Sequence, residues 1–359
     1  AAIVLKEIVK RNPQIPAEEI EDVILGCANQ AGEDNRNVAR MASLLAELPI
    51  KIGGETVNRL CASGMAAIAN AYRAIAIGEG DFYIAGGVEQ MTRAPYVLSK
   101  SAQPFGRDVQ LFDSSFGWRF VNPKMKELYG VDGMGETAEN LAEIYKISRE
   151  SQDEFALHSQ QKAATAQNSG RLAQEIVNVE IPQKKGEPKI FSEDEFVKPD
   201  TTLDKLAKLR PAFKKDGGSV TAGNSSGLND GAAAMILASE DAVKKYNLKP
   251  LAKIISSAVV GVEPRIMGIG PVEATKKALS RANLSLEDMD IIELNEAFAA
   301  QALSVLQELG IDAKDERLNP NGGAIALGHP LGMSGTRIVG TAALELQKKN
   351  KKYALCTLC

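Results

Sequence analysis

The stretch Lys6-Glu7-Ile8-Val9-Lys10-Arg11-Asn12 returns in altered form as Lys277-Ala278-Leu279-Ser280-Arg281-Ala282-Asn283, 271 positions later. Three shorter matches follow in the same order and at nearly the same offset: Asp22-Val23-Ile24 with Asp290-Ile291-Ile292, Ser63-Gly64 with Ser334-Gly335, and Tyr83-Ile84-Ala85 with Tyr353-Ala354-Leu355. One such match is weak evidence, but four in order indicate that the chain contains the same structural unit twice.

Each copy alternates apolar strands with amphipathic helices. In the first copy the patterns predict helices over 1–12, 36–47 and 63–78 and strands over 21–28, 56–61 and 82–88. In the second copy they predict strands over 251–262, 289–294, 322–326 and 352–359 and helices over 271–283, 296–309 and 333–349. This alternation predicts an α/β fold in which helices cover a sheet.

A segment of different character separates the two copies. It carries a helix that starts at Glu136 or Thr137 and a second that Ser148 caps and that runs through Gln167, followed by a polar, lysine-rich stretch over 182–218. A buried strand over 230–238 then closes the first half. The predicted domains are therefore 1–93 plus 229–249 for the N-terminal half, 94–228 for an inserted loop domain, and 250–359 for the C-terminal half.

The ends of the chain differ from the ends of the repeat. The first copy has no strand before its Lys6 helix to match 251–262, and the second has none after 352–359 to match 230–238. We therefore expect both terminal strands of the duplicated fold to be absent from this chain.

The amino-acid composition excludes several classes of protein function. Of the 359 residues, 25% are charged and 44% hydrophobic, as in soluble globular proteins, and no apolar run approaches the roughly 20 residues that span a membrane. The net charge of −4 argues against nucleic acid as a partner. Four cysteines are too few for a disulfide framework, and none has the spacing of a zinc site, so we expect no metal and a reducing, cytoplasmic location.

Cys61 lies between a predicted strand and a helix that starts near Ser63, with the small neighbours Ala62, Ser63 and Gly64. A helix N-terminus favours the thiolate form of a cysteine, which is the form of a covalent nucleophile. The alternative is a buried structural cysteine, which is a common role for a free thiol.

Two histidines are available for catalysis. His329 follows a predicted strand and, by the repeat, occupies the position related to the Cys61 turn, so the two turns should meet near a pseudo-twofold axis. This placement makes His329 a candidate base for Cys61, although a lone histidine is often structural. His158 lies in a polar helix of the insertion, which favours a surface or structural role.

Three further features bear on the site. In Asn295-Glu296-Ala297-Phe298 the amide can hold a water or a carbonyl oxygen, while Glu296 pairs with a charge or caps the next helix. Cys359 ends a strand at the level of Cys61, either as a proton shuttle or as part of the core. The stretch Gly223–Gly227 matches the serine-hydrolase pattern around Ser225, but its context favours a loop whose backbone approaches a ligand.

Three stretches together resemble thiolases (acetyl-CoA acyltransferases): Asn58-Arg59-Leu60-Cys61-Ala62-Ser63-Gly64, Asn295-Glu296-Ala297-Phe298 and Gly322-Gly323-Ala324-Ile325-Ala326-Leu327-Gly328-His329-Pro330. The likeness covers essentially the whole chain. It implies a thiolase-like α/β fold of two duplicated five-stranded αβαβα halves with an inserted loop domain, assembled as a homodimer or homotetramer. It also implies CoA-dependent cleavage of 3-oxoacyl-CoA to acetyl-CoA and a shortened acyl-CoA, and the reverse condensation.

The resemblance also implies roles for individual residues. Cys61 matches the acylated nucleophile, His329 the group that activates it, Asn295 the residue that holds a water in an oxyanion hole, and Cys359 the acid/base. Coenzyme A is a co-substrate and no cofactor is bound permanently. Seven positions match CoA contacts: Met125, Met134, Ala212, Phe213, Ala222, Ser226 and Phe298.

The substrate is less closely defined. Biosynthetic acetoacetyl-CoA thiolases resemble one another in carrying a histidine where this chain has Gly133, and the stretch 117–123 looks more like 3-oxoadipyl-CoA thiolases. Within that stretch Arg119 either meets a distal carboxylate or makes an ordinary surface salt bridge. The alternatives are a biosynthetic thiolase, a ketosynthase-like condensing enzyme, a non-catalytic acyl-CoA-binding homologue and, remotely, a serine hydrolase.

Overall fold

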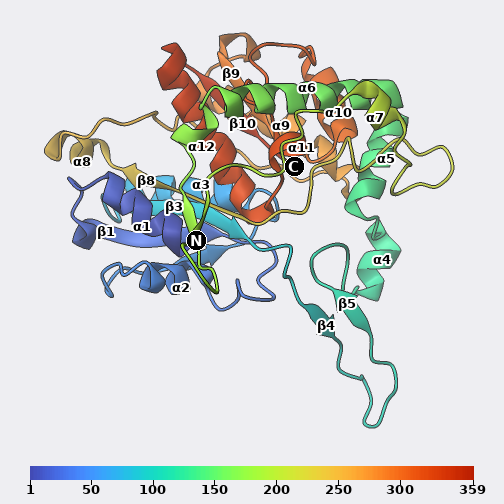
Figure 1. Cartoon of the computed structure of the whole chain (residues 1–359), viewed down its shortest axis with the longest axis horizontal. Coiled ribbons are helices and arrows are strands. Elements are labelled where there is room, and N and C mark those ends of the chain that lie inside the picture. The colour runs from blue at the N-terminus through green and yellow to red at the C-terminus, as the bar shows by residue number, and fades with distance from the viewer.

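The computed structural model describes residues 1–359. Its larger sheet has the strand order β2-β1-β3-β8. Of these strands, β1, β3 and β8 are labelled in Figure 1. Within this sheet β1 pairs in parallel with both β2 and β3, and β3 pairs antiparallel with β8. The four strands are β1 (Ile20–Gly26), β2 (Glu55–Val57), β3 (Phe82–Glu89) and β8 (Gly231–Ala238).

Helices cover both faces of this sheet because successive residues of a buried strand point to opposite sides. Val23 and Leu25 pack with residues of α1 (Ala2–Arg11) and α2 (Val38–Leu45). Ile24, between them, packs with residues of α3 (Ser63–Ala76) on the other face. The short α8 (Glu240–Lys245) follows β8 and adds Ala242 to the first of these clusters.

The second half repeats this arrangement around a smaller sheet. β9 (Ile291–Leu294) and β10 (Ala354–Thr357) pair in parallel. Ile292 packs toward α9 (Gly270–Ala282) and α10 (Ala299–Leu309), whereas Ile291 packs with residues of α12 (Leu331–Lys349). Since α3 and α12 contact each other, the layers run helix, sheet, helix, sheet, helix, with these two helices in the middle (Figure 1).

With one terminal strand of each half expected to be absent, the sequence predicts four strands in each sheet. The larger sheet has four strands, as expected, whereas the smaller has two. The predicted strand over 251–262 is absent because these residues form no hydrogen-bonded ladder with β9 or β10. The segment instead lies along α9, where Ser256 Oγ donates to the carbonyl of Ala278 at 2.7 Å.

The predicted strand over 322–326 is also wrong. Gly322 has a φ of +79°, a left-handed conformation that glycine adopts readily and that ends an extended run. The next residues form a single helical turn, α11 (Ala324–Leu327), which ends at Gly328 with a φ of +93°. The loop therefore folds back on itself before it reaches His329.

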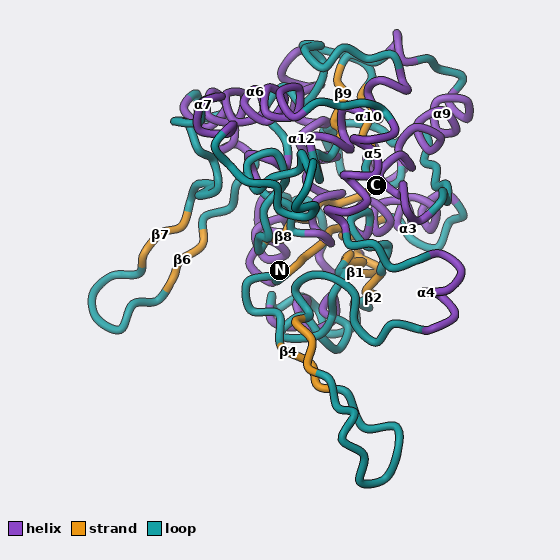
Figure 2. The backbone as a smooth tube through the Cα atoms, turned by 90° about the vertical axis from the view of Figure 1, so that its right-hand side faces the viewer, coloured by secondary structure: helices purple, strands orange, loops and turns teal.

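The inserted segment consists of helices and two hairpins. Its helices are α4 (Pro123–Tyr129), α5 (Met134–Ile144), α6 (Arg149–Asn168) and α7 (Leu203–Ala207). Ser148 caps α6 as predicted, since its Oγ accepts from the N–H of Ser151 at 3.1 Å. Two hairpins project from the body, β4 (Tyr96–Leu98) with β5 (Leu111–Asp113) and β6 (Val179–Ile181) with β7 (Lys189–Phe191) (Figure 2). No helix combines the length and the apolar character needed to cross a bilayer.

The two central helices approach closely at glycines that the repeat relates. A Cβ built on Gly64 of α3 would lie 2.5 Å from Thr336 Oγ1 and 2.7 Å from the carbonyl oxygen of Gly332. A Cβ on Gly335 of α12 would lie 2.5 Å from the backbone nitrogen of Met65. The absence of a side chain at both positions lets the first turns of the two helices touch.

We predict that Gly64→Ala destabilises the protein by about 1–3 kcal/mol or more, because the methyl group meets backbone and a β-branched side chain. The matched control is Gly340→Ala, also in α12, whose Cβ would meet only Met235 Cε at 3.9 Å. That variant should be neutral or gain up to about 1 kcal/mol from helix propensity. Urea unfolding measures both; equal midpoints for the two variants would contradict the close contact.

Candidate active site

Cys61 lies in the turn between β2 and α3. The turn is fixed by short-range hydrogen bonds: Leu60 N–H donates to Asn58 Oδ1 at 2.9 Å, and Arg59 N–H donates to Ser63 Oγ at 2.8 Å. Leu60 has a φ of +50°, which reverses the chain just before the cysteine. Only 5% of Cys61 is exposed, so the thiol lies inside the protein at the start of α3.

His329 lies across the helix contact, in the loop between α11 and α12. Its Nδ1 is 2.6 Å from Ser334 Oγ, and that hydroxyl also donates to the carbonyl of Pro330 at 3.0 Å. Because the hydroxyl proton goes to Pro330, Ser334 Oγ accepts from Nδ1–H, which leaves Nε2 as the basic nitrogen. Asn295 Nδ2 lies 3.4 Å from Nε2, as a donor to that lone pair.

Asn295 is buried at the end of β9, where its backbone N–H donates to the carbonyl of Thr357 on β10 at 3.0 Å. Its side-chain Oδ1 is buried and has no hydrogen-bond partner in the protein. A buried acceptor of this kind suits a water or another donor that arrives with the substrate.

Glu296 does not cap α10, as one interpretation of the sequence held, because that helix begins only at Ala299. Its buried carboxylate instead accepts from Ser159 Oγ at 2.6 Å, Asn319 Nδ2 at 2.7 Å and the N–H of Ile325 at 3.2 Å. Burial raises its pKa, while these hydrogen bonds act in the opposite direction. Glu296 thus joins α6 to the loop that leads to His329.

Cys359 follows β10 and packs with an apolar cluster from α5 and the start of α10. The cluster includes Met134, Ala138, Phe213 and Phe298. The neighbouring Cys359 also contributes to the raised pKa of Cys61, which places the two thiols within electrostatic reach of each other. The structure therefore places Cys61 near Cys359 and Asn295 against His329, and the turns of Cys61 and His329 precede the two helices that contact each other, α3 and α12.

The protonation states follow from burial. Burial raises the pKa of the Cys61 thiol well above its usual range, with a further contribution from Cys359. Burial, with Arg337 nearby, lowers the pKa of His329 to about 4, and burial raises the pKa of Cys359 to about 11. At Cys61 desolvation thus opposes the helix dipole, and the direction of the shift in its pKa favours the neutral thiol.

The predicted CoA contacts are brought together in part. Phe213 and Phe298 stack edge to face with their ring centroids 6.0 Å apart, beside Met134. Ser226 reaches the same place, since its N–H donates to the carbonyl of Ala297 at 3.0 Å. Ala212 and Ala222 are exposed, and Met125 lies half-buried on α4. Neither alanine belongs to the apolar cluster around Phe298.

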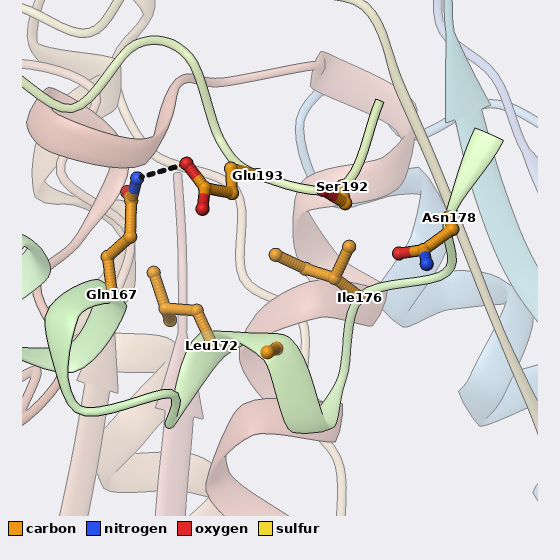
Figure 3. Close-up of a pocket in the computed structure, with 7 residues that line it drawn as sticks. Gln167, Leu172, Ile176, Asn178, Ser192 and Glu193 are labelled. Carbon is orange, nitrogen blue, oxygen red and sulfur yellow. Dashed lines mark hydrogen bonds between the residues drawn. The ribbon is translucent and has the colours of Figure 1, made fainter. Parts of the chain in front are cut away.

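Several other features lie apart from this site. His158 is on α6, and Ser225 Oγ donates to the carbonyl of Thr221 at 2.7 Å rather than to a histidine. A cavity of about 190 Å³ lies between Gln167, Leu172, Ile176, Asn178 and Glu193, where Gln167 donates to Glu193 (Figure 3). None of the catalytic candidates lines it.

One buried group has the residue types of a metal site. Cys27, Asp34 and Glu89 place ligand atoms within 4.8 Å of one another. The Glu89 carboxylate, however, accepts from the N–H groups of Ala28 and Asn29 at 2.9 Å each and of Gly332 at 2.7 Å. Through these hydrogen bonds Glu89 joins the loop after β1 to the start of α12.

The sequence patterns did not indicate the residues that hold the candidate catalytic groups. Ser334 is the clearest case, yet the repeat had already paired Ser334-Gly335 with Ser63-Gly64. Ser63 Oγ fixes the Cys61 turn in the first copy, and Ser334 Oγ orients His329 in the second. The related serines thus perform related tasks, which the repeat could have indicated.

The fold and the candidate site together define a class of protein. It is an α/β acyltransferase built from two copies of one structural unit, and its candidate site contains a cysteine, a histidine and a second cysteine. The chain belongs to the thiolase family: residues 1–241 match the thiolase N-terminal domain and residues 248–359 the thiolase C-terminal domain. The predicted family and the mixed α/β thiolase fold are thereby confirmed.

Individual relatives agree with this assignment. The chain is 59% identical to the 3-oxoadipyl-CoA/3-oxo-5,6-dehydrosuberyl-CoA thiolase of Escherichia coli (strain K12), with 100% of this chain and 89% of that protein aligned. It is 58% identical to a beta-ketoadipyl-CoA thiolase of Acinetobacter baylyi, with the same coverage. The crystal structure of the Bacillus anthracis acetyl-CoA acetyltransferase superposes with a TM-score of 0.90 at 42% identity, covering 99% of this chain and 88% of that one.

We predict that Ser334→Ala lowers kcat about tenfold or more, because His329 loses the acceptor that fixes its tautomer. The KM for CoA should stay within about twofold, since Ser334 is not one of the residues matched to CoA contacts. Ser304→Ala is the matched control, because that buried hydroxyl donates only to the carbonyl of Ala300 on its own helix. Steady-state kinetics decide; an unchanged kcat in Ser334→Ala would contradict the role given to this hydroxyl.

The neutral resting state predicts how Cys61 reacts with iodoacetamide. Because the thiol is protonated throughout the neutral range, the alkylation rate should rise about tenfold per pH unit between pH 6 and 9. Peptide mapping assigns the label, with Cys61→Ser as the control. A rate that is already constant between pH 6 and 7 would show a thiolate–imidazolium pair instead.

Proposed function

We propose that this thiolase cleaves dicarboxylic 3-oxoacyl-CoA substrates, with 3-oxoadipyl-CoA as its substrate, through an acyl intermediate on Cys61. The catalytic assignment is supported by the contact of α3 with α12, whose preceding turns carry Cys61 and His329, and by the nearness of Cys359 to Cys61 and of Asn295 to His329. The substrate rests on the names of relatives that are 58–59% identical over the whole chain.

In the first half-reaction His329 Nε2 takes the proton of the Cys61 thiol, and the sulfur attacks the 3-oxo carbon of the substrate. The bond between C2 and C3 breaks, and its electron pair leaves as the enolate of acetyl-CoA. Cys359 donates its proton to the methylene carbon of this enolate. Asn295 Oδ1 holds a water whose other proton stabilises the oxyanion, a contribution of several kcal/mol in a buried site.

In the second half-reaction free CoA takes the acyl group. The thiolate of Cys359 removes the proton of the CoA thiol, whose sulfur attacks the acyl carbon on Cys61. The Cys61 thiolate leaves and recovers its proton from the His329 imidazolium. The first half-reaction therefore leaves an imidazolium at His329 and a thiolate at Cys359 beside the acylated Cys61. The second half-reaction returns all three groups to their neutral forms, which is the resting state that burial favours.

The inserted domain, over 94–228, serves as the CoA-binding platform in this proposal. The apolar cluster of Met134, Phe213 and Phe298 suits a pantetheine arm, and Ser226 supplies a polar group beside it. CoA acts as co-substrate, and no cofactor is held permanently. The domain boundaries given in the sequence analysis are part of the same proposal.

We also propose a homodimer or homotetramer in the cytoplasm. Large apolar side chains of the β4–β5 hairpin and its tip are exposed, such as Leu98, Phe105 and Leu111, and such surfaces are typical of protein contacts. The four cysteines are free thiols, as is usual in a reducing compartment.

A biosynthetic acetoacetyl-CoA thiolase is the second candidate, because the Bacillus structure carries the name acetyl-CoA acetyltransferase. Gly133, where biosynthetic relatives resemble one another in having a histidine, disfavours it. A ketosynthase-like enzyme would need a second histidine in the site, and His158 lies on α6 instead. A serine hydrolase is disfavoured by the bond from Ser225 to a carbonyl oxygen.

Thiolysis of a panel of 3-oxoacyl-CoAs tests the proposal. We expect 3-oxoadipyl-CoA to have the highest kcat/KM, and Cys61→Ala to lose activity by at least about 10³-fold because no acyl-enzyme forms. Cys356→Ala, which removes a half-buried thiol on β10, is the matched control and should stay within about threefold of wild type. Activity retained in Cys61→Ala would contradict the mechanism, and a preference for acetoacetyl-CoA would contradict the substrate.

A further inference from the structure

Arg119 is a half-buried cation without a carboxylate partner. It lies in the loop between β5 and α4, and its guanidinium donates to Asn29 Oδ1 at 2.8 Å and to the carbonyl of Ser114 at 3.3 Å. No carboxylate oxygen of the chain lies within 4.0 Å of it. The surface salt bridge considered in the sequence analysis is therefore wrong. Other partly buried arginines are paired, such as Arg149 with Asp153 and Arg317 with Asp315.

Hydrogen bonds connect Arg119 to both halves of the catalytic site. Asn29, its acceptor, donates its backbone N–H to Glu89. Glu89 in turn accepts from Gly332, three residues after His329. The neighbouring carbonyl of Ala28 accepts from Asn58 Nδ2 at 2.8 Å, and Asn58 belongs to the turn that carries Cys61. Arg119 is therefore bonded to the loop after β1, which is itself hydrogen-bonded to the Cys61 turn and, through Glu89, to the start of α12.

The other side of the Arg119 loop contacts the segment that leads into α5. Trp118 Nε1–H donates to the carbonyl of Asp132 at 3.2 Å, two residues before Met134. The rings of Phe112 and Phe120 pack with their centroids 5.1 Å apart. These contacts on both flanks hold the Arg119 loop between the start of α5 and the loop after β1.

The chemistry of this setting suits a carboxylate. A guanidinium has five N–H donors, and the neutral acceptors Asn29 and Ser114 occupy two of them without cancelling the charge. The remaining donors form the planar fork that binds carboxylates with two parallel hydrogen bonds. A half-buried charge held only by neutral groups is stabilised when an anion arrives.

We propose that Arg119 binds the distal carboxylate of a dicarboxylic 3-oxoacyl-CoA and so selects this substrate class, an inference that rests on the proposed thiolase reaction. In 3-oxoadipyl-CoA this carboxylate lies three bonds beyond the carbon that Cys61 attacks. An uncharged chain end of the same length leaves the guanidinium without its partner, and such a substrate binds less well.

The test compares 3-oxoadipyl-CoA with 3-oxohexanoyl-CoA, which has the same six-carbon acyl chain without the carboxylate. Arg119→Gln should lower kcat/KM for 3-oxoadipyl-CoA about 10- to 100-fold, mainly through KM, and change that for 3-oxohexanoyl-CoA by less than about threefold. Arg119→Lys should recover part of the loss. Arg107→Gln, in the exposed hairpin tip, is the control and should leave both substrates unchanged.

The outcomes separate the selectivity claim from the proposed function. An equal loss on both substrates in Arg119→Gln would show that Arg119 only holds its loop, and would overturn the inference while leaving the thiolase reaction intact. A wild-type protein that cleaves both substrates equally well would overturn it as well. A wild-type protein that cleaves neither would overturn the proposed function itself.

Discussion

The contact between the first turns of α3 and α12 is the constraint on which the rest of the site depends. Gly64 and Gly335 have no side chains, so backbone meets backbone or a short side chain across the interface. Each helix begins two residues after a residue proposed for catalysis, Cys61 in one case and His329 in the other. Close approach of the helices therefore brings the two turns that carry this thiol and this imidazole to one interface from positions far apart in the sequence.

Burial at this contact determines which protonation states the resting protein favours. A thiolate and an imidazolium would each lose their hydration inside the protein, and the pKa directions of Cys61 and His329 both favour the neutral forms. A neutral thiol and a neutral imidazole cost little free energy to bury. The proton passes from Cys61 to His329 only when the bound substrate stabilises the charges that develop. The surrounding hydrogen bonds of Ser334 and Glu296 keep the histidine loop ready for that step.

Much of this arrangement could be predicted from the sequence because duplication is visible in sequence. The repeat predicted the layers and the turn that carries Cys61 before α3, and it pairs that turn with the one that carries His329 before α12. It failed for 251–262, whose apolar residues suit a strand, because whether a segment finds a partner strand depends on tertiary packing. The burial that raises the pKa of Cys61 could not be predicted either, because it depends on packing between segments distant in sequence.

The central claim is that Cys61 carries the acyl group between the two half-reactions. The direct measurement is to mix the protein with 3-oxoadipyl-CoA in the absence of free CoA, quench, and locate the modification by peptide mass spectrometry. The account predicts a succinyl group on the peptide that contains Cys61, with release of acetyl-CoA in equal amount. A succinyl group on Cys359, or release of acetyl-CoA with no acylated peptide, would contradict it.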